Sequence, residues 1–425
     1  MVNKFMFRFL HPPDEDDGMQ IVEEKSKLRQ TVLLNDNIHS FLRTRKNCIG
    51  EYYRNKKWDR FKKFANDYEL IFTSSTNFPS MSSYQAISRS FFKLWEILHD
   101  FEKDLHYKTR PSIRAAFLAE GPGGFMEAFA RYRTNERLKS DTIYGITLIS
   151  ADKNIPNWKL PKDVMESANI HLLTGADKTG SLYSIENIEA FASEIGESSL
   201  DLITSDGGFD FSTDFNNQED LSMHLIICEM YMALRLQAVG GVFVLKIYDI
   251  QTMNTMRLLW VLQSHYQDLY IVKPLSSRPA NSEKYVIAFG FKCAQDFEMM
   301  GVLLKIIQSK DYKHLAKIIV PDMFIHQITQ YNVYYISRQV LNIHKTLTLI
   351  QTLKPFPNIP MYNQQSTLGR DRDITPFEHL PNTSFKECLK RQLKKSIRWC
   401  HKYGLCISID AVKSYNVIYG LNDAS

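Results

Sequence analysis

The 425-residue sequence lacks any apolar run long enough to cross a membrane, because no stretch approaches about 18 uninterrupted apolar residues. It also lacks a recognisable secretory signal. The apolar residues 1–10 are interrupted by Lys4 and Arg8, and prolines and acidic residues follow without a small-residue cleavage site. We therefore expect neither a signal peptide nor a transmembrane segment, and no membrane partner.

Cysteine is scarce, with six scattered along the chain, which suits a reducing compartment such as the cytoplasm. Cys388, Cys400, His401 and Cys406 lie close in sequence, but their spacing matches no common zinc pattern, so we predict no metal site. Apolar residues make up 44% of the chain and charged residues 23%, as in ordinary globular proteins, and the length predicts two or three domains.

The chain also lacks a strong excess of charge, since its formal net charge is only +5, but its basic residues are unevenly placed. Nine lysines and arginines lie within residues 43–63, interleaved with Tyr52, Tyr53, Trp58 and Phe61. Cations beside aromatic rings suit a nucleic-acid strand, although a solvated basic helix fits the same pattern. Residues 386–402 form a second basic run, for which apolar residues at every fourth position favour a packed amphipathic helix.

The middle of the chain alternates β-rich runs with helical stretches. We predict strands at 115–119, 142–147, 170–173, 200–204, 242–247, 269–272 and 285–291, and helices at 88–98, 125–133, 185–195, 221–237 and 252–265. This alternation predicts an α/β fold with a doubly wound, Rossmann-like sheet, in which ligands bind beyond the carboxyl ends of strands. Residues 1–80 would form a basic helical extension, 81–295 the central domain, and 296–425 an added helical or α+β domain.

The first motif that carries chemistry is Glu120-Gly121-Pro122-Gly123-Gly124-Phe125, directly after a predicted strand and opening a helix. Its glycines would let a ligand approach the backbone closely. The turn does not have the G-x-G-x-x-G spacing of dinucleotide enzymes, and its carboxylate suits an amine-bearing ligand better than a pyrophosphate. The amino-acid end of S-adenosylmethionine fits. A tight turn without a ligand is the alternative.

Four ionisable residues lie at strand ends or just before the domain. Asp206 precedes two glycines, Lys246 ends an apolar strand, Glu283 opens the last strand, and Lys93 lies on an amphipathic helix. Each has an ordinary explanation as well, in the same order: a capped turn, a snorkelling lysine, a polar loop, and an exposed lysine on a packed helix. Partial burial would lower the pKa of Lys246, as a lysine base requires. If the four residues met in the fold, Lys93 would add to that shift, whereas Asp206 and Glu283 would oppose it.

The order Lys93…Asp206…Lys246…Glu283 around the glycine turn resembles the FtsJ-like ribose 2′-O-methyltransferases. The blocks FKLWEIL, LAEGPGGF, GADKTGSL, SDGGFDF, GGVFVLK and KPLSSRPANSEKYVI are similar to the Adrift-type cap methyltransferase branch of that family, in the same order. The resemblance covers about residues 85–295 and says little about either end. The chain as a whole is similar to a viral member of the family.

The resemblance implies a catalytic tetrad of Lys93, Asp206, Lys246 and Glu283, with Lys246 as the base. It also implies that S-adenosyl-L-methionine is held by a larger set, namely Glu120, Gly121, Pro122, Gly123, Gly124, Phe125, Thr147, Asp177 and Asp206. Asp177 would lie near the adenine. Thr147 stands where many such folds carry an acid for the cofactor ribose, so that contact is open.

The implied partner is RNA, most specifically capped mRNA, together with the capping or transcription machinery, and the implied location is the cytoplasm or, for a viral member, the host cytoplasm and the virion. Three alternatives stay open. The chain could be an RNA-binding or structural subunit without turnover, a methyltransferase of ribosomal RNA, or a nicotinamide oxidoreductase, although the last is disfavoured by the absent G-x-G-x-x-G.

Overall fold

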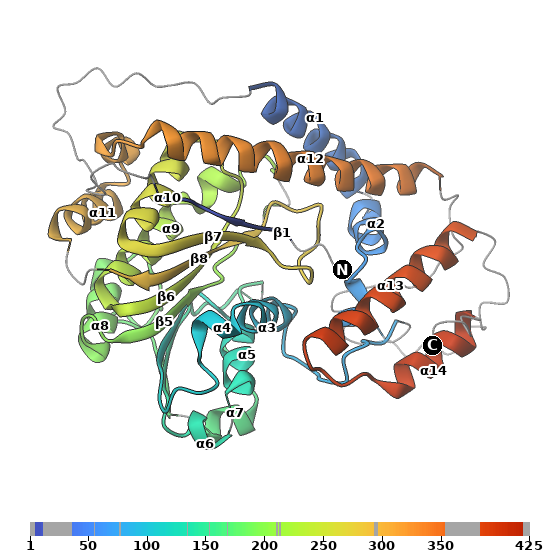
Figure 1. Ribbon diagram of the computed structural model, residues 1–425, viewed down its shortest axis with the longest axis horizontal. Coiled ribbons are helices and arrows are strands. Elements are labelled where there is room, and N and C mark those ends of the chain that lie inside the picture. The colour runs from blue at the N-terminus through green and yellow to red at the C-terminus, as the bar shows by residue number, and fades with distance from the viewer. Residues whose placement is uncertain are drawn as a thin grey trace.

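The computed structural model describes residues 5–11, 36–352 and 383–419, apart from gaps at 55, 76–77, 134, 153, 168, 210, 212–213 and 293–295. Its centre is an eight-stranded sheet (Figure 1). In spatial order the strands are β1 (Phe5–Arg8), β7 (Tyr266–Lys273), β8 (Lys284–Phe291), β6 (Gln237–Ile247), β5 (Leu200–Ser205), β2 (Arg114–Leu118), β3 (Thr142–Ile146) and β4 (Asn169–Leu173).

The direction of the strands makes the sheet doubly wound. Strands β6, β5, β2, β3 and β4 are parallel, whereas β8 runs antiparallel between β6 and β7. The chain moves outward from β2 to β3 and β4, and then returns to the other side of β2 to form β5 and β6. The sheet therefore has its topological switch point between β2 and β5, where ligands of such folds bind beyond the carboxyl ends.

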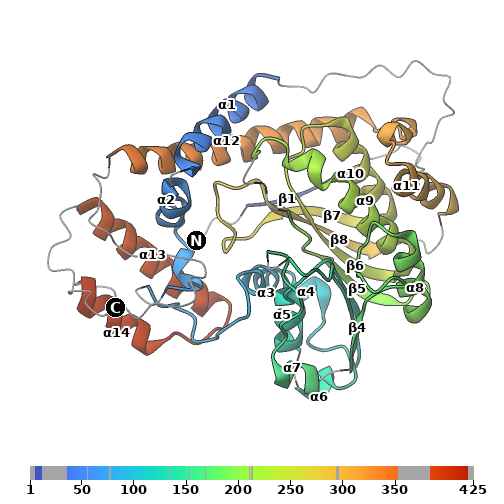
Figure 2. The same cartoon turned by 180° about the vertical axis from the view of Figure 1, so that it is seen from behind.

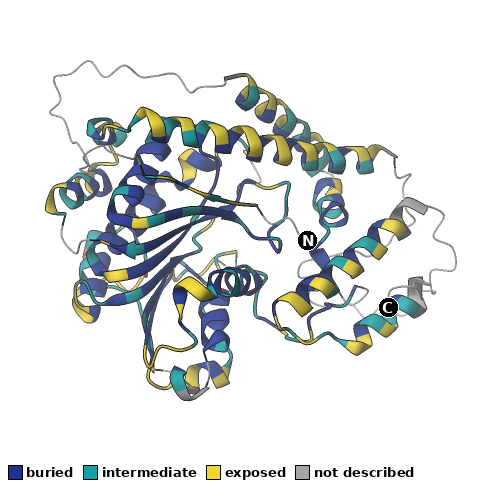
Figure 3. Ribbon diagram, viewed as in Figure 1, coloured by how far each residue is buried: buried dark blue, intermediate teal, exposed yellow. Residues whose placement is uncertain are grey.

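Helices cover both faces of the sheet (Figures 1 and 2). Alternate residues of β2 divide between two cores, because successive side chains of a strand point to opposite faces. Ala115 and Phe117 pack in one core with α3 (Ser90–Asp100), α4 (Glu102–Leu105) and α5 (Gly124–Tyr132). Ala116 and Leu118 pack in the other core with α8 (Ile185–Ile195), α9 (Gln218–Leu236), α10 (Met253–His265) and α11 (Phe297–Ser309). The predicted α/β fold class is confirmed, and Figure 3 shows that the strands are mostly buried.

The flanking segments pack on each other as well as on the central part. Helices α1 (Asp36–Tyr53) and α2 (Lys57–Ala65) both contact α12 (Asp322–Thr352), which crosses the top of Figure 1. Beyond it, α13 (Thr383–Lys402) contacts the short helix η1 (Glu69–Ile71), and α14 (Ile409–Tyr419) follows. The Trp399 ring of α13 lies 5.9 Å from that of Phe92 on α3. The three-part division of the chain stays a prediction.

The remaining helices are short: α6 (Asn135–Leu138), α7 (Lys162–Ser167) and η2 (Tyr312–Lys317). In the part of the chain that the structure describes, no helix combines the length and the apolar character that a membrane crossing needs.

Two details differ from the prediction. The helix expected at 221–237 ends at Leu236, and Gly240 and Gly241 lie inside β6 and do not cap the helix. The pairing of β5 with β6 shifts at this point, and Gly240 has a φ of 79°, so the glycines form a bulge that other residues adopt at a cost. The second difference is β1, which extends the sheet by pairing with β7 and was not predicted.

Candidate active site

Four ionisable side chains from different parts of the chain meet near the carboxyl ends of β5 and β6. Asp206 directly follows β5, Lys246 is the last residue but one of β6, and Glu283 directly precedes β8. The antiparallel pairing of β6 and β8 places Lys246 opposite Tyr285, two residues after Glu283. Lys93 reaches the same point from α3.

Distances join the four side chains into one cluster. The Lys93 Nζ donates to Glu283 Oε2 at 2.7 Å, and Lys246 Nζ lies 3.8 Å from the same oxygen. Lys246 Nζ also lies 3.3 Å from Asp206 Oδ1 and donates to the Asp206 backbone oxygen at 3.2 Å. Each side chain is between 10% and 12% exposed, so the cluster is largely shielded and still open to a ligand. The structure thus brings the predicted tetrad together, and its catalytic role stays a prediction.

Three further groups, which the sequence interpretation left without a role, orient the acids of the cluster. The Tyr285 hydroxyl donates to Asp206 Oδ1 at 2.7 Å, and the Ser277 hydroxyl donates to Glu283 Oε1 at 2.7 Å. The Lys273 ammonium donates to the backbone oxygen of Glu283. All three residues lie in or beside the KPLSSRPANSEKYVI block, but the sequence alone does not show which of its polar residues turn inward.

The acids of the cluster decide the protonation state of Lys246. Burial lowers its pKa, but the charges of Asp206, Tyr248 and Glu283 outweigh burial and hold the pKa above its ordinary value. Burial also raises the pKa of Glu283, yet Lys93, Lys246 and Lys273 more than offset this and hold that pKa below its ordinary value. Of the opposing influences expected on the Lys246 pKa, the acids therefore outweigh burial, and the Lys246 amine is held as an ammonium.

The glycine-rich turn between β2 and α5 encloses an unsatisfied acid. Glu120 is buried, and its Oε1 accepts a hydrogen bond from Thr204 Oγ1 at 2.5 Å. Its buried Oε2 has no hydrogen-bond partner among the residues that the structure describes, and burial raises the Glu120 pKa well above its usual range. A buried carboxyl oxygen without a donor fits an amine-bearing ligand, such as the amino-acid end of S-adenosylmethionine.

The turn itself requires glycine at two positions. A Cβ on Gly121 would lie 2.0 Å from the Pro156 backbone oxygen, and Gly123 has a φ of 109°. The Gly121 amide donates to Thr147 Oγ1 at 2.9 Å. Thr147, which directly follows β3, therefore helps to fix the turn. The tight conformation of this turn is therefore built into these residues.

Other predicted cofactor residues lie as follows. Gly124 begins α5, and the Pro122 oxygen accepts from the Lys159 amide at 2.9 Å. Phe125 is buried, with its ring 5.7 Å from the Tyr285 ring, so its side chain packs in the interior. Asp177 is exposed after β4, and its Oδ1 accepts from the Thr179 amide and hydroxyl. The role of each stays a prediction.

The basic segment at 43–63 is less available to RNA than its sequence suggests. Lys46, Trp58 and Phe61 are buried, so these members cannot contact a phosphate or stack on a base. Arg43, Arg54, Lys56 and Lys57 are exposed. The second basic run is an amphipathic helix as predicted, because Leu389 and Leu393 of α13 are buried whereas Lys390 and Lys394 are exposed.

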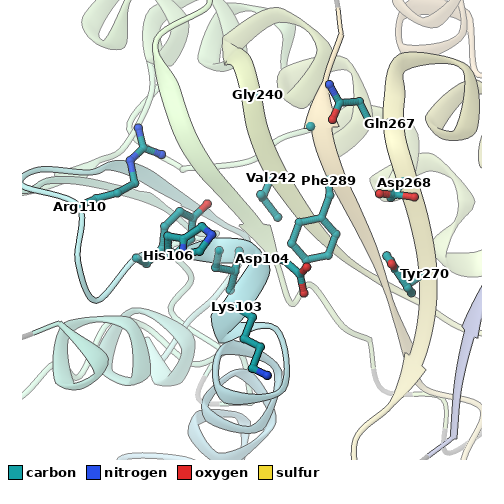
Figure 4. Close-up of a pocket in the computed structure, with 13 residues that line it drawn as sticks. Lys103, Asp104, His106, Arg110, Gly240, Val242, Gln267, Asp268, Tyr270 and Phe289 are labelled. Carbon is teal, nitrogen blue, oxygen red and sulfur yellow. The ribbon is translucent and has the colours of Figure 1, made fainter.

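A cavity of about 540 Å³ lies near the amino ends of β6 and β7, at the far end of these strands from the ionisable cluster (Figure 4). Its lining includes Gly240 and Val242 near the start of β6, Asp268 near the start of β7, and Phe289 near the end of the antiparallel β8. Lys246 lies at the other end of β6. The cavity is therefore separate from the ionisable cluster.

Comparison with known proteins finds a family that the central part of the chain matches. Residues 86–291 match the family described as FtsJ-like methyltransferase. The chain is 30% identical over 270 residues to cap-specific mRNA (nucleoside-2′-O-)-methyltransferase 1 of Mus musculus, which covers 60% of this chain and 30% of that protein. It is 32% identical over 199 residues to the protein of that name in Trypanosoma brucei brucei, covering 47% of this chain and 51% of that protein.

A longer alignment reaches into both flanks. The Danio rerio protein of the same name is 30% identical over 404 residues, which covers 89% of this chain and 45% of that protein. The chain thus spans about half or less of the length of these relatives.

Proposed function

We propose that this protein transfers a methyl group from S-adenosyl-L-methionine to a ribose 2′-hydroxyl of capped mRNA, because residues 86–291 match the FtsJ-like methyltransferase family. The observation that carries the proposal is the convergence of Lys93, Asp206, Lys246 and Glu283 at the carboxyl ends of the strands. The names of the relatives support capped mRNA as the substrate.

The residues around the glycine turn fit the cofactor. Glu120 offers an unsatisfied carboxyl oxygen to its amino group, and Gly121 and Gly123 allow the turn beside it to pack closely against Pro156 and Leu160. Asp177 would lie near its adenine, and Asp206 would face both the cofactor and the reacting centre. When bound, S-adenosylmethionine supplies a methyl group on a positively charged sulfur.

In the proposed mechanism Lys246 takes the proton from the ribose hydroxyl as that oxygen becomes the nucleophile. The Asp206 and Glu283 carboxylates hold the Lys246 amine from two sides, and Lys93 holds Glu283 in turn. Fixed positioning of the reacting groups supplies most of the effect, because aligning two reactants can lower a barrier by several kcal/mol. Lys246 must first lose its own proton, which its raised pKa makes a costly step at neutral pH.

Labelled S-adenosylmethionine tests the proposal directly. We expect label to pass to a short capped RNA and not to the same RNA whose candidate riboses are 2′-deoxy. Transfer to ribosomal RNA but not to capped RNA would contradict the proposed substrate. Binding of RNA and cofactor without any transfer would favour a subunit that keeps the fold without turnover.

Glu120→Gln tests the cofactor site. The change keeps the shape of the side chain, but an amide cannot ionise to pair with the ammonium group of the ligand. A charge-assisted hydrogen bond is then lost, and we expect the affinity for S-adenosylmethionine to fall about tenfold or more. Calorimetric titration measures this. Glu194→Gln, which removes an exposed acid of α8, is the control. Equal affinities of the two variants would remove Glu120 from the site.

The exposed part of the basic segment is open to a separate test. Replacing Arg43, Arg54 and Lys56 with Gln removes three exposed cations, and we expect the slope of log affinity for RNA against log salt to flatten by about 2 units, at about 0.7 per lost phosphate contact. Gln at Lys305, Lys310 and Lys313, which are also exposed, is the matched control. An unchanged slope would make the segment an ordinary solvated surface.

The partners, origin and location of the protein are also part of the proposal. Capping or transcription machinery as a partner, a viral origin and a cytoplasmic location are implied by the resemblance and stay predictions.

A further inference from the structure

The pairing of β6 with β8 includes Lys246 but ends just short of Glu283. The last paired residues are Ile247 and Lys284, so Glu283 lies one residue outside the ladder. Beyond this point the backbone is no longer paired: Tyr248 and Asp249 follow β6, and Ser282 and Glu283 precede β8. The backbone ladder therefore does not fix Glu283 by itself, and side chains must hold the ends together.

One side chain of the N-terminal extension joins these two ends. The Lys46 Nζ of α1 donates to Asp249 Oδ2 at 2.5 Å and to Ser282 Oγ at 2.9 Å. The Ser282 hydroxyl donates to the same Asp249 oxygen at 3.1 Å. All three residues are at most 4% exposed, so the triangle is closed to solvent and its charges interact more strongly than surface charges do.

The long helix α12 holds the same two ends from a second side. Gln339 Nε2 donates to Ser282 Oγ at 3.2 Å, and the Tyr335 hydroxyl donates to the Asn281 backbone oxygen at 3.1 Å. Asn332 Nδ2 donates to the Ile250 backbone oxygen at 2.6 Å. Both flanking segments therefore contact the turn that carries Glu283, although neither helix lies within residues 86–291.

We propose that Lys46 is a positioning residue, which clamps the ends of β6 and β8 and so fixes Glu283 against Lys93 and Lys246. The inference rests on the proposed function. It also gives the flanks a role, since the central domain alone would lack the clamp. Removing the Lys46 ammonium takes a shared donor from Asp249 and Ser282, and a buried carboxylate that loses its partner disturbs its surroundings.

Lys46→Met tests the clamp in the full-length chain. We expect kcat for methyl transfer to fall about 10-fold to 100-fold, because small misplacement of reacting groups has effects of this size. The KM for S-adenosylmethionine should stay within about twofold, since the glycine turn is untouched. Hydrogen exchange of the peptide 275–284 should become about tenfold faster, while that of β2 stays unchanged. Lys305→Met removes an exposed lysine of α11 and is the control.

Two results would overturn the proposal: exchange of the 275–284 peptide equal to that of Lys305→Met, or kcat equal to that of the control. If Lys46→Met does not fold, Gln339→Leu removes one donor to Ser282 and keeps the ion pair, and the same peptide should exchange faster. If the unmodified protein transfers no methyl group, the proposed function fails, and the exchange measurement still decides whether Lys46 holds the Glu283 turn.

Discussion

Lys246→Met is expected to lower the rate of methyl transfer about a thousandfold and to leave the affinity for S-adenosylmethionine within about threefold. Methionine keeps most of the length of the lysine side chain and removes its amine, so the variant lacks the group that would accept the ribose proton. Single-turnover transfer to capped RNA measures the rate, and calorimetry measures the affinity. Lys305→Met on the outer surface of α11 is the matched control.

The size of this effect follows from the position of Lys246. Its Nζ lies within 3.8 Å of both carboxylates of the cluster and 3.0 Å from the position that a Cβ on Gly208 would take, so the amine lies between the two acids and beside the Gly208 backbone. The glycine turn that would hold the cofactor lies after a different strand, β2. Transfer at the rate of the control would show that another group takes the proton. A large loss of cofactor affinity would show that Lys246 binds the cofactor.

The ratio kcat/KM for capped RNA is expected to rise about tenfold per pH unit between about pH 7 and pH 9. The acids hold the pKa of Lys246 above its ordinary value, so the amine is almost wholly protonated throughout this range. Each unit of pH then raises the unprotonated fraction tenfold, and the rate follows because only the neutral amine can accept a proton. Initial rates across this range, with the fold checked by circular dichroism, measure the slope.

Glu283→Gln tests whether the neighbouring acids cause the raised pKa of Lys246. Removing a carboxylate that raises the Lys246 pKa must lower it, so the rising limb should move to lower pH even if the maximal rate falls. Glu298→Gln, which removes an exposed acid of α11, should leave the limb in place. A flat profile in the unmodified protein, or a shift of the limb to higher pH in Glu283→Gln, would contradict the assignment of Lys246 as the base.

The sequence predicts the fold well because the relevant signals are local. The helix at 185–195 agrees with α8 in both bounds, and the seven predicted strands are all present with bounds within about five residues, since each is an apolar run between turns. The positions of Asp206, Lys246 and Glu283 at strand ends follow from the same pattern, because a doubly wound sheet collects such ends at one edge.

What the sequence could not predict depends on contacts between distant residues. Lys46 reads as a basic residue in a basic run, yet its partner Asp249 lies 203 positions away and takes it out of solvent. Whether the pKa of Lys246 is raised or lowered depends on how closely the two carboxylates approach its amine, and strand order alone does not fix those distances. Trp58 and Phe61 read as aromatics for stacking, but the packing of α2 against α12 buries them.

Mass analysis of a short capped RNA after incubation with the protein and S-adenosylmethionine tests the central claim most directly. The account predicts RNA that is one methyl group heavier, with the methyl on a ribose 2′-oxygen, and no gain in mass when that ribose is 2′-deoxy. After the same short incubation, protein with Lys246→Met should methylate only a trace of the RNA. A methyl group on a base, or the same gain in mass with Lys246→Met, would contradict it.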